Sequence, residues 1–171
     1  MAKHDAKAIA NYFLDLSKGG YKLTPLKIQK LVYFAHGWNL ALRKQPLLNE
    51  RVEAWKYGPV IPSLYHEFKI YGSSPIEHKA VDLIEVDGYL REGEPSILAC
   101  SPDEAALTAR LLKRIWEVYK NYSGLQLSEL THQPGTPWEK ARKAFGDVKN
   151  ADIPDEWIQQ YFESQIVQPK T

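Results

Sequence analysis

The sequence predicts a mainly α fold with a minor β component, a compact helical bundle around one central apolar helix at about residues 24–44. Helix-start signals, in which Ser or Thr precedes Pro, recur along the chain, whereas only one or two segments have a strand-like pattern. Hydrophobic residues make up 44% and charged residues 25% of the 171 residues, which is typical of a folded globular domain. We therefore expect one domain over residues 1–171, with a short strand or hairpin.

The first two helices are predicted by apolar spacing and capping signals. A helix from about Asp5 carries one apolar stripe, formed by Ile9, Ala10, Phe13 and Leu14. In the central helix, Thr24 can cap the N-terminus and Pro25 occupies the first position, where its missing N–H costs nothing. Its apolar residues cover so much of the circumference that it belongs at the centre of a bundle: Ile28, Leu31, Val32, Ala35, Trp38 and Leu42, widened by Phe34, Leu40 and Ala41. Gly37 is disfavoured there by about 1 kcal/mol relative to alanine, so we expect a neighbouring element to approach it closely.

The middle of the chain has short elements. Residues 51–57 (RVEAWKY) alternate polar and apolar side chains and predict a short strand, and Gly58-Pro59 and Pro62 predict turns. Residues 63–72 fit a short helix whose inward residues are Leu64, Phe68 and Tyr71. Residues 73–100 predict one or two strands, with a segment near Ile97-Leu98 as one option for a pairing partner.

Four further helices are expected, at about residues 102–122, 125–131, 137–145 and 154–166. The sequence Ser101-Pro102 repeats the capping logic of the central helix. In the helix that follows, one apolar face is expected from Leu107, Leu111, Ile115 and Val118, with Leu112, Trp116 and Tyr119 beside it. The last four residues, QPKT, are expected to fray.

Charge is unevenly distributed although the net charge is only +1, a balance that argues against a generic polyanion binder. Residues 1–48 carry eight Lys/Arg and two Asp, a net of +6, whereas residues 73–104 carry two basic and eight acidic residues, a net of −6. Two explanations remain open. The segments face each other or solvate the surface, or they form charged zones that steer a charged protein partner.

The sequence has no motif for catalysis, cofactor binding or metal binding. Cys100 is the only cysteine, which excludes an intramolecular disulfide and a cysteine-based zinc site. The five histidines show no metal-ligand spacing, the phosphate-binding motifs GxxxxGK[ST] and GxGxxG are absent, and no motif supports Cys100 and His132 as a nucleophile and base. We therefore expect no enzyme activity, no cofactor and no metal. No apolar run approaches the length of a membrane span and the start lacks a signal-peptide core, so a soluble cytoplasmic protein is expected.

The aromatic content is the remaining unexplained feature. Five Trp, ten Tyr and five Phe amount to 12%, more than one small core requires. Trp55, Tyr57, Tyr65 and Tyr71 cluster within seventeen residues around two prolines. They either fill the core or form a partner-binding surface, in which Trp and Tyr typically supply the anchors.

The stretch from Leu26 to Gly72 resembles a known family. LKIQKLVYFAHGWNLAL followed by PLLNERVEAWKYGPVIPSLYHEFKIYG is similar to the signature of the Panacea domain family, also known as SocA-like or GepA phage-associated proteins, and LSELTHQPGTPWEKAR resembles its C-terminal motif. Two departures are that His36 stands where glutamine is more often expected and that the acidic segment 73–100 has no clear counterpart. The matching polar and aromatic residues are Gln29, Lys30, Trp38, Trp55, Tyr57, Gly58, Pro59, Tyr65, Thr131, His132, Pro137 and Trp138.

The resemblance implies an antitoxin, encoded beside a toxin and often carried on mobile or prophage elements. Such proteins are thought to neutralise a toxin by direct binding, some by handing it to a protease, and no catalytic residue or cofactor is attributed to them. Trp38 and Gly58 are expected to hold the fold, and Tyr57, Tyr65 and His132 to be exposed. The candidate partner-binding residues are Trp55, Tyr57, Tyr65, His66 and His132.

A DNA-binding autoregulator is the main alternative from another class. Lys27 and Lys30, with the Thr-Pro start, vaguely resemble a recognition helix, but the apolar circumference of that helix favours burial. A hydrolase is disfavoured by the missing motifs. The expected partner is therefore a protein toxin rather than nucleic acid or a membrane, while the toxin's identity and the oligomeric state stay open.

Overall fold

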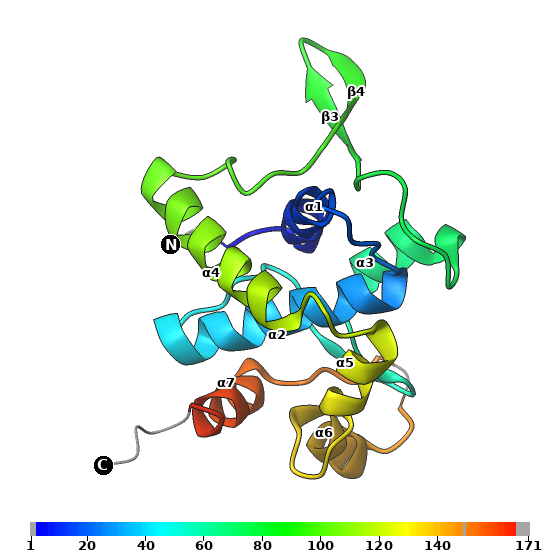
Figure 1. The fold of residues 1–171 in the computed structure, drawn as a ribbon, viewed down its shortest axis with the longest axis vertical. Coiled ribbons are helices and arrows are strands. Elements are labelled where there is room, and N and C mark those ends of the chain that lie inside the picture. The colour runs from blue at the N-terminus through cyan, green and yellow to red at the C-terminus, as the bar shows by residue number, and fades with distance from the viewer. Residues whose placement is uncertain (1–2, 149, 167–171) are drawn as a thin grey trace.

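The computed structural model describes residues 3–148 and 150–166, and over these residues the chain forms seven α-helices, one short 3-10 helix and two antiparallel hairpins (Figure 1). This confirms the mainly α prediction with a minor β component. The elements are α1 (Ala6–Ser17), α2 (Pro25–Arg43), β1 (Glu53–Trp55), β2 (Gly58–Val60), α3 (Pro62–Phe68), η1 (Lys69–Tyr71), β3 (Asp82–Val86), β4 (Tyr89–Gly93), α4 (Pro102–Tyr119), α5 (Gly124–Thr131), α6 (Pro137–Phe145) and α7 (Asp155–Ser164). The QPKT tail lies outside the described residues.

Helix α2 is the centre of the bundle, as predicted. In Figure 1 it crosses the molecule with α1 above it and α7 below, and α4 and α5 also pack against it. The Thr24 hydroxyl accepts a hydrogen bond from Lys27 N (3.3 Å), and every residue from 27 to 37 is buried. The helix ends at Arg43, and its C-cap residue Lys44 adopts a left-handed conformation (φ 58°). Leu42, which was predicted in the apolar stripe, is 58% exposed, so the buried stripe does not extend to the last turn at this residue.

Gly37 is where α7 approaches α2. A Cβ at this position would overlap the ring of Phe162, which is itself buried. The predicted close approach is thus confirmed, and the packing of the α7 aromatic ring offsets the intrinsic cost of glycine in a helix.

The buried face of helix α4 is rotated from the predicted one toward Leu112 and Trp116, which were expected beside it. Leu111 and Ile115 are buried, as expected, whereas Leu107 and Val118 are exposed. The buried face is centred on Leu112, Ile115 and Trp116, so the two exposed residues lie beyond its edge.

The first hairpin is formed by β1 and β2. Glu53 pairs with Val60 and Trp55 with Gly58, so that Lys56 and Tyr57 form the turn. The prediction of a turn at Gly58-Pro59 is therefore wrong: these residues begin the second strand, where Gly58 has a φ of 120° that only glycine adopts easily. On its other side β1 is held by Ala54 N, which donates to Ala151 O (2.8 Å).

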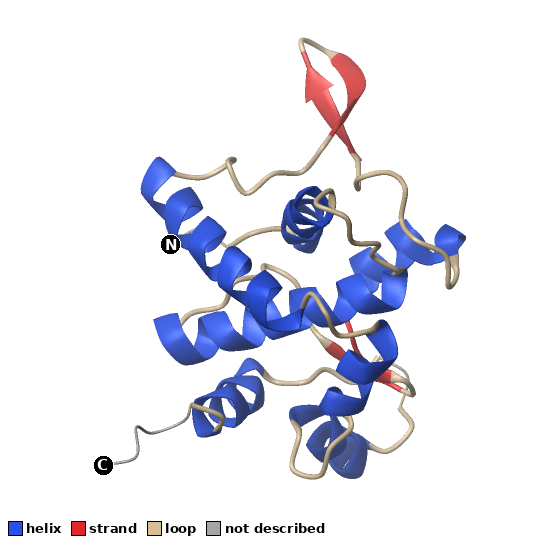
Figure 2. Cartoon of the chain, in the orientation of Figure 1, coloured by secondary structure: helices blue, strands red, loops and turns tan. Residues whose placement is uncertain are grey.

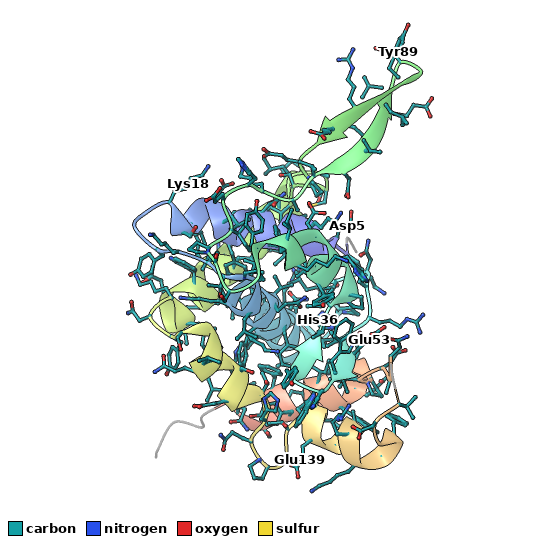
Figure 3. All side chains as sticks on the ribbon, turned by 90° about the vertical axis from the view of Figure 1, so that its right-hand side faces the viewer. Asp5, Lys18, His36, Glu53, Tyr89 and Glu139 are labelled. Atoms are coloured by element: carbon teal, nitrogen blue, oxygen red, sulfur yellow. The ribbon has the colours of Figure 1, made fainter. Side chains whose placement is uncertain are left out.

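The second hairpin confirms a β element in residues 73–100. β3 pairs with β4 through a tight turn at Asp87-Gly88, both with positive φ, which matches the twist of a two-residue hairpin loop. The optional pairing with Ile97-Leu98 is wrong; Ile97 is instead buried in the core. The hairpin, drawn in red at the top of Figure 2, projects from the helical body, with Tyr89 near its tip (Figure 3).

The oppositely charged segments partly face each other. Lys7 on α1 pairs with Asp82 at the start of β3 (2.6 Å), and Arg43 at the end of α2 pairs with Glu104 (2.9 Å). Lys79, a basic residue of the acidic segment, pairs with Asp15 of α1 (2.9 Å). The Lys7–Asp82 and Lys79–Asp15 pairs hold the base of the projecting hairpin against α1. The first of the two explanations for the charge pattern therefore accounts for part of it.

Candidate functional site

A groove lies where the start of α2, the β1–β2 turn and α3 meet, on the side of the molecule that Figure 3 turns toward the viewer. It encloses about 570 Å³ and its walls are largely apolar. We call it the aromatic groove; its lining residues are Pro25, Leu26, Gln29, Lys30, Trp55, Lys56, Tyr57, Val60, Leu64, Tyr65, Lys69 and Gly72.

Three of the five sequence-predicted site residues come together in this groove. Trp55 and Tyr65 pack edge to face with ring centroids 4.9 Å apart. The Trp55 Nε1 donates to a Glu53 carboxylate oxygen (2.6 Å), which fixes the indole. Tyr57, at the tip of the turn, is 73% exposed and Tyr65 is 44% exposed. Large aromatic faces are therefore presented to solvent from a fixed support.

The two predicted histidines lie outside the groove lining. His66 is exposed on α3 and its ring packs against Tyr65, with centroids 5.5 Å apart. His132 is half-buried behind the β1–β2 hairpin, rather than exposed as expected. Its Nδ1 donates to Ser128 O (2.6 Å) and its ring lies against Trp138 (4.1 Å), so it supports the back of the hairpin.

Hydrogen bonds that the sequence did not reveal hold the groove in shape. Buried Gln29 bonds both polar groups of Ile61: its Nε2 donates to Ile61 O (3.0 Å) and its Oε1 accepts from Ile61 N (3.0 Å). Since Ile61 precedes α3, this pair fixes α3 to α2. The indole of Trp138 donates to Trp55 O (2.6 Å), which fixes β1 to α6.

Lys30 is the unusual residue of the site. Its side chain projects from α2 into the groove lining, yet the residue is only 1% exposed. The Nζ donates to Pro59 O (2.9 Å), and desolvation by burial lowers the pKa of Lys30 from 10.5 to about 7. A Cβ on Gly58 would lie 2.6 Å from this Nζ, so glycine is required for the amine to fit.

Sequence reasoning missed most of the groove. In the sequence, Lys30 is a family match and one of two lysines of a possible recognition helix, and no pattern marks Lys56 or Lys69 as a site residue. No spacing in the sequence marks these lysines, because the groove joins α2, a turn and α3, which are separated along the chain. The proximity of Lys56 to the aromatic cluster was the one available signal.

The structure also bears on the alternatives. Lys27 and Lys30 are both buried, and Lys27 Nζ donates to Lys120 O (2.5 Å), so neither is available to read DNA. The Cys100 thiol donates to Ile97 O (3.0 Å), while the His132 ring donates to Ser128 O.

Over residues 3–148 and 150–166, no three His, Cys, Asp or Glu side chains are grouped as metal ligands would be. None of the helices in this part of the chain is both long and apolar enough to cross a bilayer.

Comparisons with known proteins identify the family. The family described as antitoxin SocA-like, Panacea domain, matches residues 28–139. Antitoxin SocA of Caulobacter vibrioides (strain NA1000 / CB15N) is 32% identical over 136 residues, which cover 79% of this chain and 69% of the relative. No solved structure matches significantly. The family match contains α3, the β1–β2 hairpin and nearly all of α2, and with them most of the aromatic groove; this chain belongs to the SocA-like antitoxin family with a Panacea domain.

Proposed function

We propose that this protein is an antitoxin that neutralises a protein toxin by binding it directly through the aromatic groove. Family membership and the resemblance to antitoxin SocA support the antitoxin role. The observation that carries the location is the exposed aromatic pair, Tyr57 and Tyr65, beside the fixed indole of Trp55.

The physical argument for the groove is its prior organisation. The Gln29–Ile61 and Trp138–Trp55 hydrogen bonds fix its walls before any partner arrives, so little conformational entropy is lost on binding. Tyrosine presents a large apolar face and a polar hydroxyl, which suits a surface that is exposed until the partner binds. Binding itself, without catalysis, is sufficient for neutralisation if the toxin's active surface is covered.

The test is neutralisation of the protein encoded in the neighbouring reading frame. Expressed alone this product should arrest growth, and co-expression with the full chain should restore it. Replacing Tyr57 and Tyr65 together by alanine should weaken the complex by about 1–3 kcal/mol for each anchor. Tyr89→Ala is the matched control, because Tyr89 is 70% exposed on the other hairpin. If Tyr89→Ala abolishes neutralisation while the double variant does not, the groove is the wrong surface.

The level of the toxin in the same cells distinguishes two modes of neutralisation, occlusion of the toxin and its delivery to a protease. Under occlusion the toxin persists, and purified antitoxin blocks its activity without other components. If the toxin instead disappears when the antitoxin is present, and purified antitoxin does not inhibit it, the protease adaptor alternative replaces occlusion.

A further inference from the structure

The charge of the aromatic groove is one-sided. Three lysines, Lys30, Lys56 and Lys69, contribute to its lining, which contains no Asp or Glu. Within the described chain none of the three forms an ion pair, whereas Lys7, Lys79 and Arg43 each reach a carboxylate. The Lys56 Nζ lies over the Tyr57 ring, 5.4 Å from its centroid, and both residues line the groove. The groove is thus lined by positively charged side chains with no carboxylate among the lining residues.

Lys30 shows the same imbalance in a buried position. An ammonium group has three N–H donors, and the described residues give the Nζ one acceptor within hydrogen-bond distance, Pro59 O. A buried cation without a carboxylate is costly, which is why burial alone shifts Lys30 toward its neutral form. A negatively charged group that entered the groove would restore the charged form and provide the missing acceptor.

The walls indicate what kind of molecule carries that negative charge. Leu26, Val60 and Leu64 give the groove an aliphatic surface between the aromatic rings, which suits apolar side chains. Nucleic acid would need exposed cations along a continuous path, and Lys27 and Lys30 are buried instead. A peptide segment with both acidic and apolar side chains fits these observations better.

We infer that the aromatic groove takes an acidic, apolar segment of the toxin, with one carboxylate seated against Lys30 and others near Lys56 and Lys69. This inference rests on the proposed function and goes beyond it by naming the chemistry of the segment recognised. Lys30 acts as a specificity-determining residue, since only a partner with a carboxylate at that point compensates its buried charge.

A pH signature follows from this arrangement. Because free Lys30 has a pKa of about 7 and the seated carboxylate favours its charged form, binding takes up a proton at pH 8. The affinity contributed by Lys30 therefore falls as the pH rises above about 7, by less than tenfold per pH unit, which is the limit for the uptake of one proton. The other titratable groups around this amine are His132 at the end of α5, Lys56 and Tyr57 in the turn, and Tyr65 and Lys69 on α3 or at its end.

The experiment measures toxin affinity by calorimetry between pH 6.5 and 8.5 for the wild-type chain and Lys30→Met. Methionine is unbranched and reaches as far as the lysine Cε, but it has no amine. Titration of groups within the toxin changes both dissociation constants alike, so it drops out of their ratio. We expect Lys30→Met to bind about tenfold or more weakly at pH 6.5, and the ratio to approach one at pH 8.5. His132→Asn should retain the pH dependence, and Lys113→Gln, at an exposed position on α4, should change nothing.

A second probe needs no toxin. In NMR titrations 3-phenylpropionate should shift the Lys30 ε-methylene signal of the wild-type chain, and the uncharged 3-phenylpropionamide should do so at least tenfold more weakly. Equal toxin affinities for wild type and Lys30→Met at every pH would overturn the inference and leave the proposed function standing. If the toxin does not bind at all, the proposed function fails, and equal effects of the two small probes would then overturn the inference by itself. Tighter binding of a single-stranded oligonucleotide than of the carboxylate would also overturn it.

Discussion

Two buried polar residues of α2 have opposite surroundings. Lys30 and His36 are six residues apart and are 1% and 0% exposed. His36, labelled near the centre of Figure 3, has partners at both ring nitrogens. Leu48 N donates to Nδ1 (3.4 Å), so Nε2 carries the proton and donates to Asp155 Oδ1 (2.8 Å). The ammonium group of Lys30 has three N–H donors, and the described residues provide one acceptor for them, Pro59 O.

The difference shows that burial alone does not assign a role. His36 uses its hydrogen bonds to join α2 to α7 and to the segment after α2, which is a structural task completed within the chain. Lys30 is left with hydrogen-bonding capacity that the described residues do not use, and it lies at the lining of a groove. An incompletely satisfied buried cation is therefore the better indication of a binding site.

The largest expected effect concerns the stability of Lys30 variants at different pH. The folded pKa of about 7 lies below the ordinary 10.5, so the unfolded chain binds more protons between these values and wild-type stability rises with pH there. Lys30→Met lacks this dependence and should be the more stable protein at pH 7. Chemical denaturation from pH 7 to 10 should show this advantage shrinking by up to about 1.4 kcal/mol per pH unit. A constant difference would mean that Lys30 is charged and compensated in the folded protein.

His36→Ala should lower the free energy of unfolding by about 3 kcal/mol, because it leaves a cavity and removes both hydrogen bonds. The folded fraction should bind the toxin normally, since His36 does not line the groove. Urea denaturation combined with calorimetry checks both expectations. Weakened binding by fully folded protein would contradict the structural role.

Two glycines allow a matched test of the same contrast. Gly37 follows His36 in the sequence, and a Cβ there would overlap the ring of Phe162; a Cβ at Gly58 would lie 2.6 Å from Lys30 Nζ. Gly37→Ala should cost about 2 kcal/mol of stability by overpacking, with unchanged affinity. Gly58→Ala should cost about 1–2 kcal/mol because its φ is 120°, and it should also weaken toxin binding by displacing the amine. Thermal melts and affinity measurements on both variants separate the outcomes. If Gly58→Ala binds the toxin as tightly as Gly37→Ala does, Lys30 does not take part in recognition.

The smallest effect is expected at the projecting hairpin. Leu90 is 71% exposed on β4, so Leu90→Ser should change stability by less than about 0.5 kcal/mol. Neutralisation should also be unchanged if the aromatic groove is the main contact. A clear loss of neutralisation in this variant would indicate that the toxin binds the β3–β4 hairpin instead.

Local sequence signals were enough to predict three helix starts. Thr24, Ser101 and Thr136 each accept a hydrogen bond from the backbone N–H three residues on, and each is followed by proline, so the information lies within one helical turn. The central position of α2 was predictable for a related reason, since its apolar circumference is a property of the segment alone. The aromatic cluster around Trp55 was also visible in the sequence.

The set of residues that form the groove, and the burial of Lys30, depend on contacts between segments that are distant in the sequence. The turn was misplaced at Gly58-Pro59 because the register of β1 and β2 depends on contacts with Ala151, Trp138 and Lys30, which are distant in the sequence. Burial of Lys30 results from the packing of α2 against the β1–β2 hairpin and the end of α5. The sequence pattern of a helix does not show how many hydrogen-bond acceptors the elements packed against it will provide. Local propensity and capping act over a few residues, whereas desolvation and the supply of hydrogen-bond partners depend on every element that packs around a group.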